Sequence, residues 1–215
     1  MGASHLGFRA AMAVALFVVA ASSKATVFTF SDLSGITIPA SGTSGISSPY
    51  PSTINAAGVT GGVIDVTATL TGLTHTFPGD LDILLVGPGG QKVLLMSDAG
   101  GGTDVNNVNL TFSDAAASEL TGAPIASGTF RPSNLGAGDA FPAPAPAGPY
   151  GSVLSAFDGV DPNGAWSVFV FDDAGVDVGT IASWSLSITA TVPEPGTLAL
   201  LAIAAVGLVW RRRRQ

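Results

Sequence analysis

Apolar and polar residues alternate with a period of two through the middle of this chain, and this pattern limits what the chain can fold into. Residues 64–70 place an apolar side chain at every second position. Residues 181–189 do the same, with Trp184, Leu186 and Ile188 between Ser and Thr residues. Successive side chains of a β-strand point to opposite faces, so the pattern predicts half-buried strands whose apolar residues, the two tryptophans Trp166 and Trp184 included, face a core.

Further short strands are expected between Gly- and Pro-rich turns. They cover residues 27–30, 81–86, 92–96, 108–112, 129–130 and 165–171. The last of these is apolar on both faces, which predicts a central strand that is covered on both sides. Seven or eight short strands without a helical pattern predict an all-β, jelly-roll sandwich of about eight strands.

Two segments lack the alternation. Residues 34–61 are rich in Ser, Gly, Pro and Thr and are expected to form a long turn-rich stretch. Residues 137–151 contain four prolines spaced by Ala and Gly, which predicts an exposed, partly polyproline insertion within the domain. The body therefore consists of 26–59, a strand followed by the Ser/Gly/Pro-rich segment, and 60–192, the jelly roll with its insertion.

The charge of the body excludes one class of partner. Residues 26–192 hold 14 acidic side chains, and only Lys92 and Arg131 are basic, a net charge of −12. Such a surface repels nucleic acid and suits cations. The chain has no cysteine, which excludes disulfides, thiolate metal ligands and a cysteine nucleophile.

The C-terminal residues 193–215 have three parts in a fixed order. Pro193, Glu194 and Pro195 precede an apolar run over 196–210, and Arg211, Arg212, Arg213 and Arg214 follow. The run is shorter than the ~17–25 residues of a stable membrane span, and the arginines resist translocation. We expect a hydrophobic helix that holds the chain transiently in the inner membrane with the body outside; a plain C-terminal anchor is the alternative.

The N-terminus also carries an export pattern. Arg9 precedes an apolar run over 10–21, and small residues lead to Ala25. The pattern predicts a helical signal peptide, residues 1–25, that signal peptidase cuts after Ala25. A retained membrane helix is disfavoured because the run is short.

The C-terminal tail resembles the PEP-CTERM sorting signal of Gram-negative bacteria that make exopolysaccharide. The resemblance implies recognition by an exosortase, a membrane-embedded enzyme that cuts near the Pro193–Pro195 motif. The protein would pass through the inner membrane and reach the cell surface or the extracellular matrix.

The run from His75 to Gly90, with Gly79-Asp80-Leu81 at its centre, resembles the P domain, or Homo B domain, of proprotein convertases. Three later stretches match in the same order, and the resemblance covers about residues 60–190. It implies an eight-stranded jelly roll that is not catalytic but packs on a protease and supports its folding. The Pro-rich insertion departs from the family's spacing.

Catalytic residues are not evident. Gly42-Thr43-Ser44 resembles the surroundings of a subtilase nucleophile but is better explained as a turn, since a triad also needs a base and an orienting acid. The body has a single histidine, His75, which we expect to be a hydrogen-bonding structural residue at a strand start. The ~35 residues before the P-domain match are too few for a catalytic domain.

The acidic residues form three groups along the chain. The first surrounds a Gly-rich loop, the second follows the predicted central strand, and the third flanks the start of the strand 81–86: Asp98, Asp104, Asn106 and Asp114, then Asp172, Asp173 and Asp177, and finally Asp80 and Asp82. Calcium prefers 6–8 oxygen ligands of this kind, so the groups predict a calcium cofactor. Solvated turn aspartates are the alternative. Tyr50 and Tyr150, in loops, are the side chains most free to contact a ligand.

These observations predict an exported, non-catalytic protein of the cell surface or exopolysaccharide matrix. Its processing partners would be signal peptidase and an exosortase, and its ligand an exopolysaccharide. The alternative is an accessory P domain that docks on an exported subtilisin-like protease. A hydrolase that uses His75 is a third and weaker hypothesis.

Overall fold

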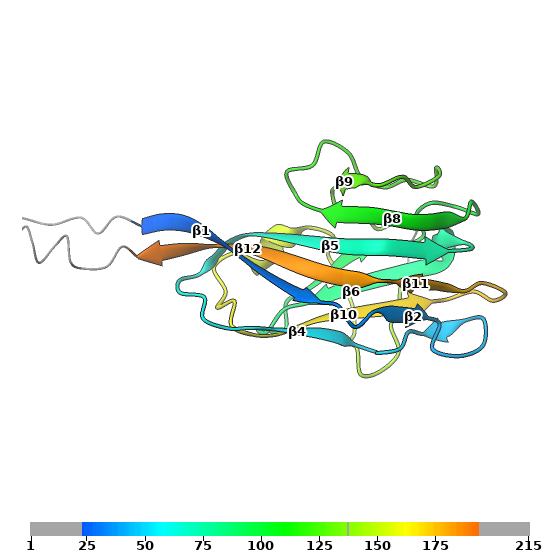
Figure 1. Ribbon diagram of the computed structural model, residues 1–215, viewed down its shortest axis with the longest axis horizontal. Helices are drawn as coiled ribbons and strands as arrows, with labels where there is room; N and C mark the ends of the chain where they lie inside the picture. The colour runs from blue at the N-terminus through cyan, green and yellow to red at the C-terminus, as the bar shows by residue number, and fades with distance from the viewer. Residues whose placement is uncertain (1–22, 137, 194–215) are drawn as a thin grey trace, which may run out of the picture. The chain divides into compact units, whose positions relative to one another are not determined.

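The computed structural model describes residues 23–136 and 138–193 (Figure 1). Apart from two short 3-10 turns, η1 (Pro78–Asp80) and η2 (Leu154–Phe157), all regular structure in this part is β, which confirms the all-β prediction. Across these residues, no helix is long and apolar enough to cross a membrane. Of the predicted signal helix, residues 1–22 lie outside the described residues, and residues 23–25 belong to strand β1. The predicted hydrophobic C-terminal helix also lies outside the described residues.

The strands form two sheets that enclose a common core. The larger sheet has seven strands: in order β1 (Ser23–Asp32), β12 (Ser183–Pro193), β5 (Val63–His75), β11 (Gly179–Ile181) and β2 (Ile36–Ile38), with β8 (Val105–Phe112) also on β5 and β9 (Gly128–Phe130) parallel to β8. The smaller sheet has five: β3 (Gly45–Ile46), β10 (Gly164–Asp172), β6 (Leu81–Val86) and β7 (Lys92–Met96), with β4 (Ser52–Ala56) also on β10.

All eight predicted strands are present, and four short ones accompany them. Strands β2, β3 and β4 lie in the segment 34–61, which the sequence predicts as turns. They are too short to show an alternating pattern, and each is held by a partner strand: β2 pairs with β11, while β3 and β4 pair with the longer β10. Tertiary pairing overrides local propensity here.

The core contains both tryptophans, as predicted. Trp166 and Trp184 are among the largest fully buried side chains, and each indole has a hydrogen-bond acceptor. Trp166 Nε1 donates to Pro162 O at 2.9 Å, and Trp184 Nε1 donates to Ser52 Oγ at 2.7 Å. A buried indole with a satisfied N–H is a packing residue.

The alternation predicted for residues 64–70 fails at its first position. Opposite β12, Asp65 pairs with Thr189 and Val63 pairs with Ala190, so the residue between them is an unpaired bulge. Ile64 is 44% exposed, and Val63 is buried in its place at 1%. A β-bulge shifts the face of every residue before it.

The outer face of the smaller sheet has a second apolar cluster. Its buried members are Leu84, Leu94, Phe141 and Phe169, with Tyr50 and Tyr150 packed against them. Phe169 comes from β10, so this strand is covered on both faces, as predicted. The cover comes largely from the Pro-rich insertion, which the sequence presents as exposed. Most of its residues are exposed, but Phe141 is only 8% exposed.

Both loop tyrosines serve this cover and are only partly exposed. The Tyr50 hydroxyl donates to Pro142 O at 2.9 Å, and its ring packs edge-on against Phe169 with ring centres 5.1 Å apart. The Tyr150 hydroxyl donates to Pro146 O at 2.8 Å, and its ring packs edge-on against Phe141. Residues far apart in the sequence thereby fix the insertion on the sheet.

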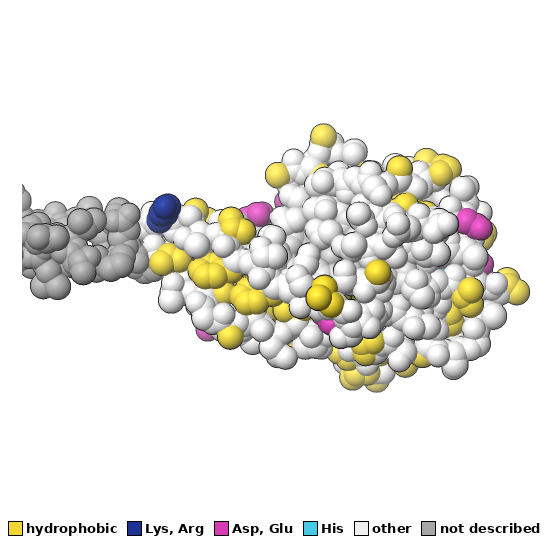
Figure 2. Space-filling model, viewed as in Figure 1, with side chains coloured by type: hydrophobic (Ala, Val, Ile, Leu, Met, Phe, Trp, Pro, Cys, Tyr) yellow, Lys and Arg dark blue, Asp and Glu magenta, His cyan; other side chains and the backbone are white. Residues whose placement is uncertain are grey.

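The β1 strand forms one edge of the larger sheet. Figure 2 shows a band of apolar side chains along it, and Val27 on this strand is exposed. An open edge with apolar side chains is available for association with another surface.

If the insertion is part of the fold, Phe141→Ala should lower the free energy of unfolding by about 3 kcal/mol, because a buried aromatic ring is removed from a packed cluster. Val153→Ala is the matched control: Val153 lies just after the insertion and is 54% exposed, so its loss should stay within about 0.5 kcal/mol. Urea denaturation of the purified chains measures both. Equal, small losses would mean that the insertion does not stabilise the sheet.

Candidate functional site

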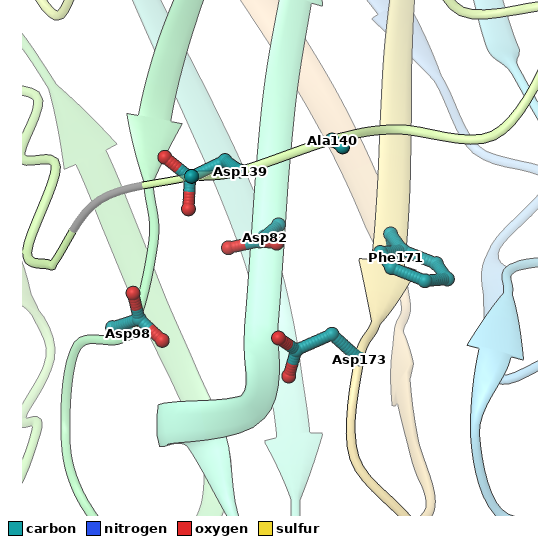
Figure 3. Close-up of a pocket in the computed structure, with 7 residues that line it drawn as sticks. Asp82, Asp98, Asp139, Ala140, Phe171 and Asp173 are labelled. Carbon is teal, nitrogen blue, oxygen red and sulfur yellow. The ribbon is translucent and has the colours of Figure 1, made fainter.

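Four carboxylates line a pocket at one end of the smaller sheet. Asp82 is the second residue of β6, Asp98 follows β7, Asp173 follows β10 and Asp139 belongs to the insertion. The pocket has a volume of about 260 Å³. Figure 3 shows the four carboxylates directed toward a shared space. In the part of the chain that the structure describes, no basic side chain lines it.

Antiparallel pairing brings these residues together. Strand β6 runs antiparallel to both β7 and β10, so its start lies beside the ends of its two neighbours. Asp82 is paired with Phe171, two residues before Asp173, and Ile83 is paired with Met96, two residues before Asp98. The insertion adds Asp139 from above the outer face.

Asp82 is the buried member of the pocket. Its neighbours Leu81 and Ile83 face the main core, so the Asp82 side chain lies on the outer face and is 5% exposed. Burial raises the pKa of Asp82 to about 7; the Ser97 hydroxyl opposes this shift, and the nearby charges of Asp139, Asp173 and Asp98 add to it. Burial disfavours the charged form of a carboxyl.

Ser97 is a shared donor in the pocket. Its hydroxyl donates to Asp139 Oδ1 at 2.8 Å, and Asp98 Oδ2 lies 3.2 Å away. A serine hydroxyl has one proton to donate. The three carboxylates Asp82, Asp98 and Asp139 therefore compete for a single hydrogen bond.

A second acidic group lies nearby, around a buried histidine. The sequence predicts His75 at the start of a strand, but it is the last residue of β5. Its Nδ1 accepts a hydrogen bond from the Phe77 N–H at 3.2 Å, and its Nε2 lies 3.4 Å from Asp172 Oδ2. Both side chains are fully buried. Burial raises the pKa of Asp172, although the His75 ring opposes this shift.

Asp80 and Asp177 complete this second group. Burial raises the pKa of Asp80 to about 6, with contributions from the charges of Asp177, Asp172 and Asp173. Asp177 accepts a hydrogen bond from the Thr76 hydroxyl at 3.1 Å. These contacts tie the β10–β11 connection to the end of β5.

The geometry around His75 offers no nucleophilic triad. Both ring nitrogens face groups inside the fold, and the ring has no exposed surface. Within 23–136 and 138–193, no serine or threonine hydroxyl is hydrogen-bonded to it. The Gly42–Ser44 stretch is an exposed turn between β2 and β3. A general base must reach both its nucleophile and the substrate.

The structure regroups the predicted calcium ligands. Asp98 and Asp173 line the pocket, and Asp172 and Asp177 lie in the group around His75. Asp104 and Asn106 are exposed. Asp114 has a structural role, since its two carboxylate oxygens accept hydrogen bonds from the N–H groups of Leu154 and Ser155.

One carboxylate of the pocket, Asp139, is absent from the predicted acidic groups. Asp82 belongs to one of these groups and carries a further signal, because it is a charge inside the apolar strand 81–86, where burial is expected. The sequence gives no such signal for Asp139, because this residue lies in a Pro-rich stretch without periodicity. Among the described residues, no three His, Asp or Glu side chains are arranged as a ready-made metal group. The pocket is an acidic hollow whose chemistry suits cations.

Some predicted processing residues lie on the described body. Ala25 is exposed on β1 and pairs with Thr191 of β12, and Pro193 ends β12. Glu194, Pro195, Arg211, Arg212, Arg213 and Arg214 lie outside the described residues.

The raised pKa values of Asp82 and Asp80, about 7 and about 6, predict a pH dependence. In the unfolded chain both titrate near ~3.9, so between about pH 4 and pH 7 the folded chain binds more protons than the unfolded chain. Stability should therefore fall as pH rises through this window. Urea midpoints at pH 5 and pH 8 in chelator should show the fall, and Asp82→Asn should reduce it. If the wild-type protein and the Asp82→Asn variant lose the same stability between pH 5 and pH 8, Asp82 is not a source of this pH dependence.

Comparisons with known proteins agree with both resemblances. Residues 191–214 match the family described as PEP-CTERM protein-sorting motif, and residues 63–131 match the proprotein convertase P-domain. No protease-domain family matches the chain.

Similar proteins are larger. "Leupeptin-inactivating enzyme 1" of Streptomyces exfoliatus is 27% identical over 158 residues, 74% of this chain and 25% of that protein. The chain thus spans a quarter of the length of this curated relative. The serine protease of Aeromonas sobria in complex with its chaperone aligns with 17% identity and a TM-score of 0.39 over 78% of this chain and 27% of that one. The same protease alone aligns with a TM-score of 0.37 and 16% identity, over 77% of this chain and 27% of that one.

The P-domain is a non-catalytic accessory domain, and the sorting motif indicates export and processing in a Gram-negative bacterium. The chain is therefore similar to PEP-CTERM proteins over residues 191–214 and to the proprotein convertase P-domain over residues 63–131.

Proposed function

We propose that this protein is exported through the inner membrane, loses its C-terminal tail to an exosortase and acts without catalysis at the cell surface or in the exopolysaccharide matrix. The match of residues 191–214 to the sorting motif carries this proposal. The acidic body and its open edge strand β1 suit a structural or adhesive component, because such an edge can associate with another surface.

The arrangement of the chain ends supports processing at both sites. Strands β1 and β12 are antiparallel, and Ser23 pairs with Pro193. The two ends of the described body therefore lie side by side (Figure 1). Cleavage after Ala25 and near Pro193 would trim the same two-stranded ribbon. The buried core residues Trp184, Leu186 and Ile188 would remain in the mature protein.

The environment of His75 supports the proposal that the protein acts without catalysis. The ring is fully buried and faces the Phe77 N–H and Asp172, so a substrate at the surface cannot reach it. The family match points the same way, since the P-domain is an accessory to catalysis.

The mature C-terminus tests the sorting proposal. An epitope tag inserted after Gly122 avoids the packed insertion, because Gly122 is exposed and has open space around it. We expect intact-mass analysis of the tagged protein from an exosortase-bearing host to show loss of residues after the Pro193–Pro195 region, with the tag in the surface or matrix fraction.

A matched variant with Pro193, Glu194 and Pro195 replaced by alanine should keep its tail and stay in the inner membrane. A wild-type protein that retains residues 196–215 in the inner membrane would contradict sorting and would indicate a tethered domain.

A second function is favoured by the P-domain match and by the similarity to "Leupeptin-inactivating enzyme 1". The protein would dock on a separate exported subtilisin-like protease, as P domains dock on proteases in the same chain. Purification through the Gly122 tag distinguishes the two functions. Stoichiometric recovery of a subtilisin-like protease supports docking, and recovery of polysaccharide without protease supports the matrix function.

A further inference from the structure

We propose that the pocket lined by Asp82, Asp98, Asp139 and Asp173 binds one calcium ion. The inference goes beyond export and processing, because it concerns the mature body alone. It also differs from the ligand groups that follow from the sequence, since it joins one residue from each of four separate segments.

Within the described residues, no basic side chain balances the charge of the pocket. Three basic side chains belong to the described residues, and none lines the pocket. Arg131 pairs with Glu119, Lys92 donates to Ala147 O, and Lys24 lies near the start of β1. Four carboxylates around one hollow repel each other unless a cation or protons reduce their charge.

Asp82 is the observation that separates this pocket from a cluster of surface aspartates. Its side chain is 5% exposed and points into the pocket (Figure 3). A buried carboxylate normally accepts hydrogen bonds or pairs with a charge. The Ser97 hydroxyl beside it is shared with Asp139 Oδ1 at 2.8 Å and Asp98 Oδ2 at 3.2 Å. Asp82 therefore has at most a share of one hydrogen bond and no charged partner.

A divalent cation supplies that partner. It would contact Asp82 at the base of the pocket and draw in Asp98, Asp139 and Asp173, which are more exposed. Because no three of these carboxylates are already at metal-binding geometry, their side chains must rotate to close around the ion. The site is therefore flexible in the absence of metal.

The lining selects calcium among the common divalent cations. All ligands are carboxylate oxygens, with no imidazole or thiolate in the pocket, which disfavours zinc and copper. Magnesium demands a near-ideal octahedron, whereas calcium tolerates irregular sites of 6–8 oxygens. A site that closes by side-chain rotation suits the weak binding of extracellular modules, with Kd of about 10⁻⁴–10⁻³ M.

The test is a titration of the purified full chain, in mild detergent and freed of metal by chelator, with calcium chloride at pH 7.5. Equilibrium dialysis should show one calcium bound per chain. Calcium at ten times its Kd should raise the melting temperature by about 3–5 °C. Sodium chloride at matched ionic strength should not reproduce this rise.

Variants locate the site. Asp82→Asn and Asp173→Asn should each weaken calcium binding at least tenfold. Asp104→Asn is the matched control: it removes the same charge from an exposed position outside the pocket, so it should leave the affinity unchanged. Asp139→Asn, in the insertion, provides an independent test should Asp82→Asn fail to fold, and it should also weaken binding.

Three results would overturn the proposal. They are no calcium bound at 10 mM, an equal rise in melting temperature from sodium chloride, and unchanged affinity in the Asp139→Asn and Asp173→Asn variants. Each is independent of whether the C-terminal tail is cleaved, so the site can fail while the sorting proposal stands.

Discussion

Strand β10 requires cover on both of its faces, and much of the structure follows from that requirement. Trp166, Val168 and Val170 are buried in the main core, while Phe169 faces the other way. An ordinary sandwich strand leaves its second face to water. Here the Pro-rich insertion and Tyr50 cover it, so a segment without regular structure becomes part of the fold.

The same cover creates the acidic pocket. By crossing the outer face of the sheet, the insertion carries Asp139 to the ends of β7 and β10 and encloses Asp82 beneath it. Burial then raises the pKa of Asp82. Covering β10 stabilises the sheet through apolar contact, and it also gathers negative charge at one place. A bound calcium ion would offset this negative charge while the apolar contacts of the cover remain in place.

Much of the fold was predictable because it depends on local patterns, whereas the site depends on pairing. Alternation located the long strands and the inward tryptophans. It failed at Ile64, because the bulge there is defined only by the register with β12, and in residues 34–61, because β2, β3 and β4 depend on partner strands. Asp98 and Asp173 were predicted as ligands, but in different groups, since neither chain distance nor composition reveals that β6 lies between β7 and β10.

A crystal structure of the full chain grown in calcium chloride above pH 7 tests the central claim most directly, with anomalous scattering used to identify the ion. We expect one calcium peak in the pocket, with an Asp82 carboxylate oxygen at about 2.3–2.6 Å and oxygens of Asp98, Asp139 and Asp173 completing part of its shell. A pocket without a peak, in which Asp82 is protonated and hydrogen-bonded to a neighbouring carboxylate, would contradict the account.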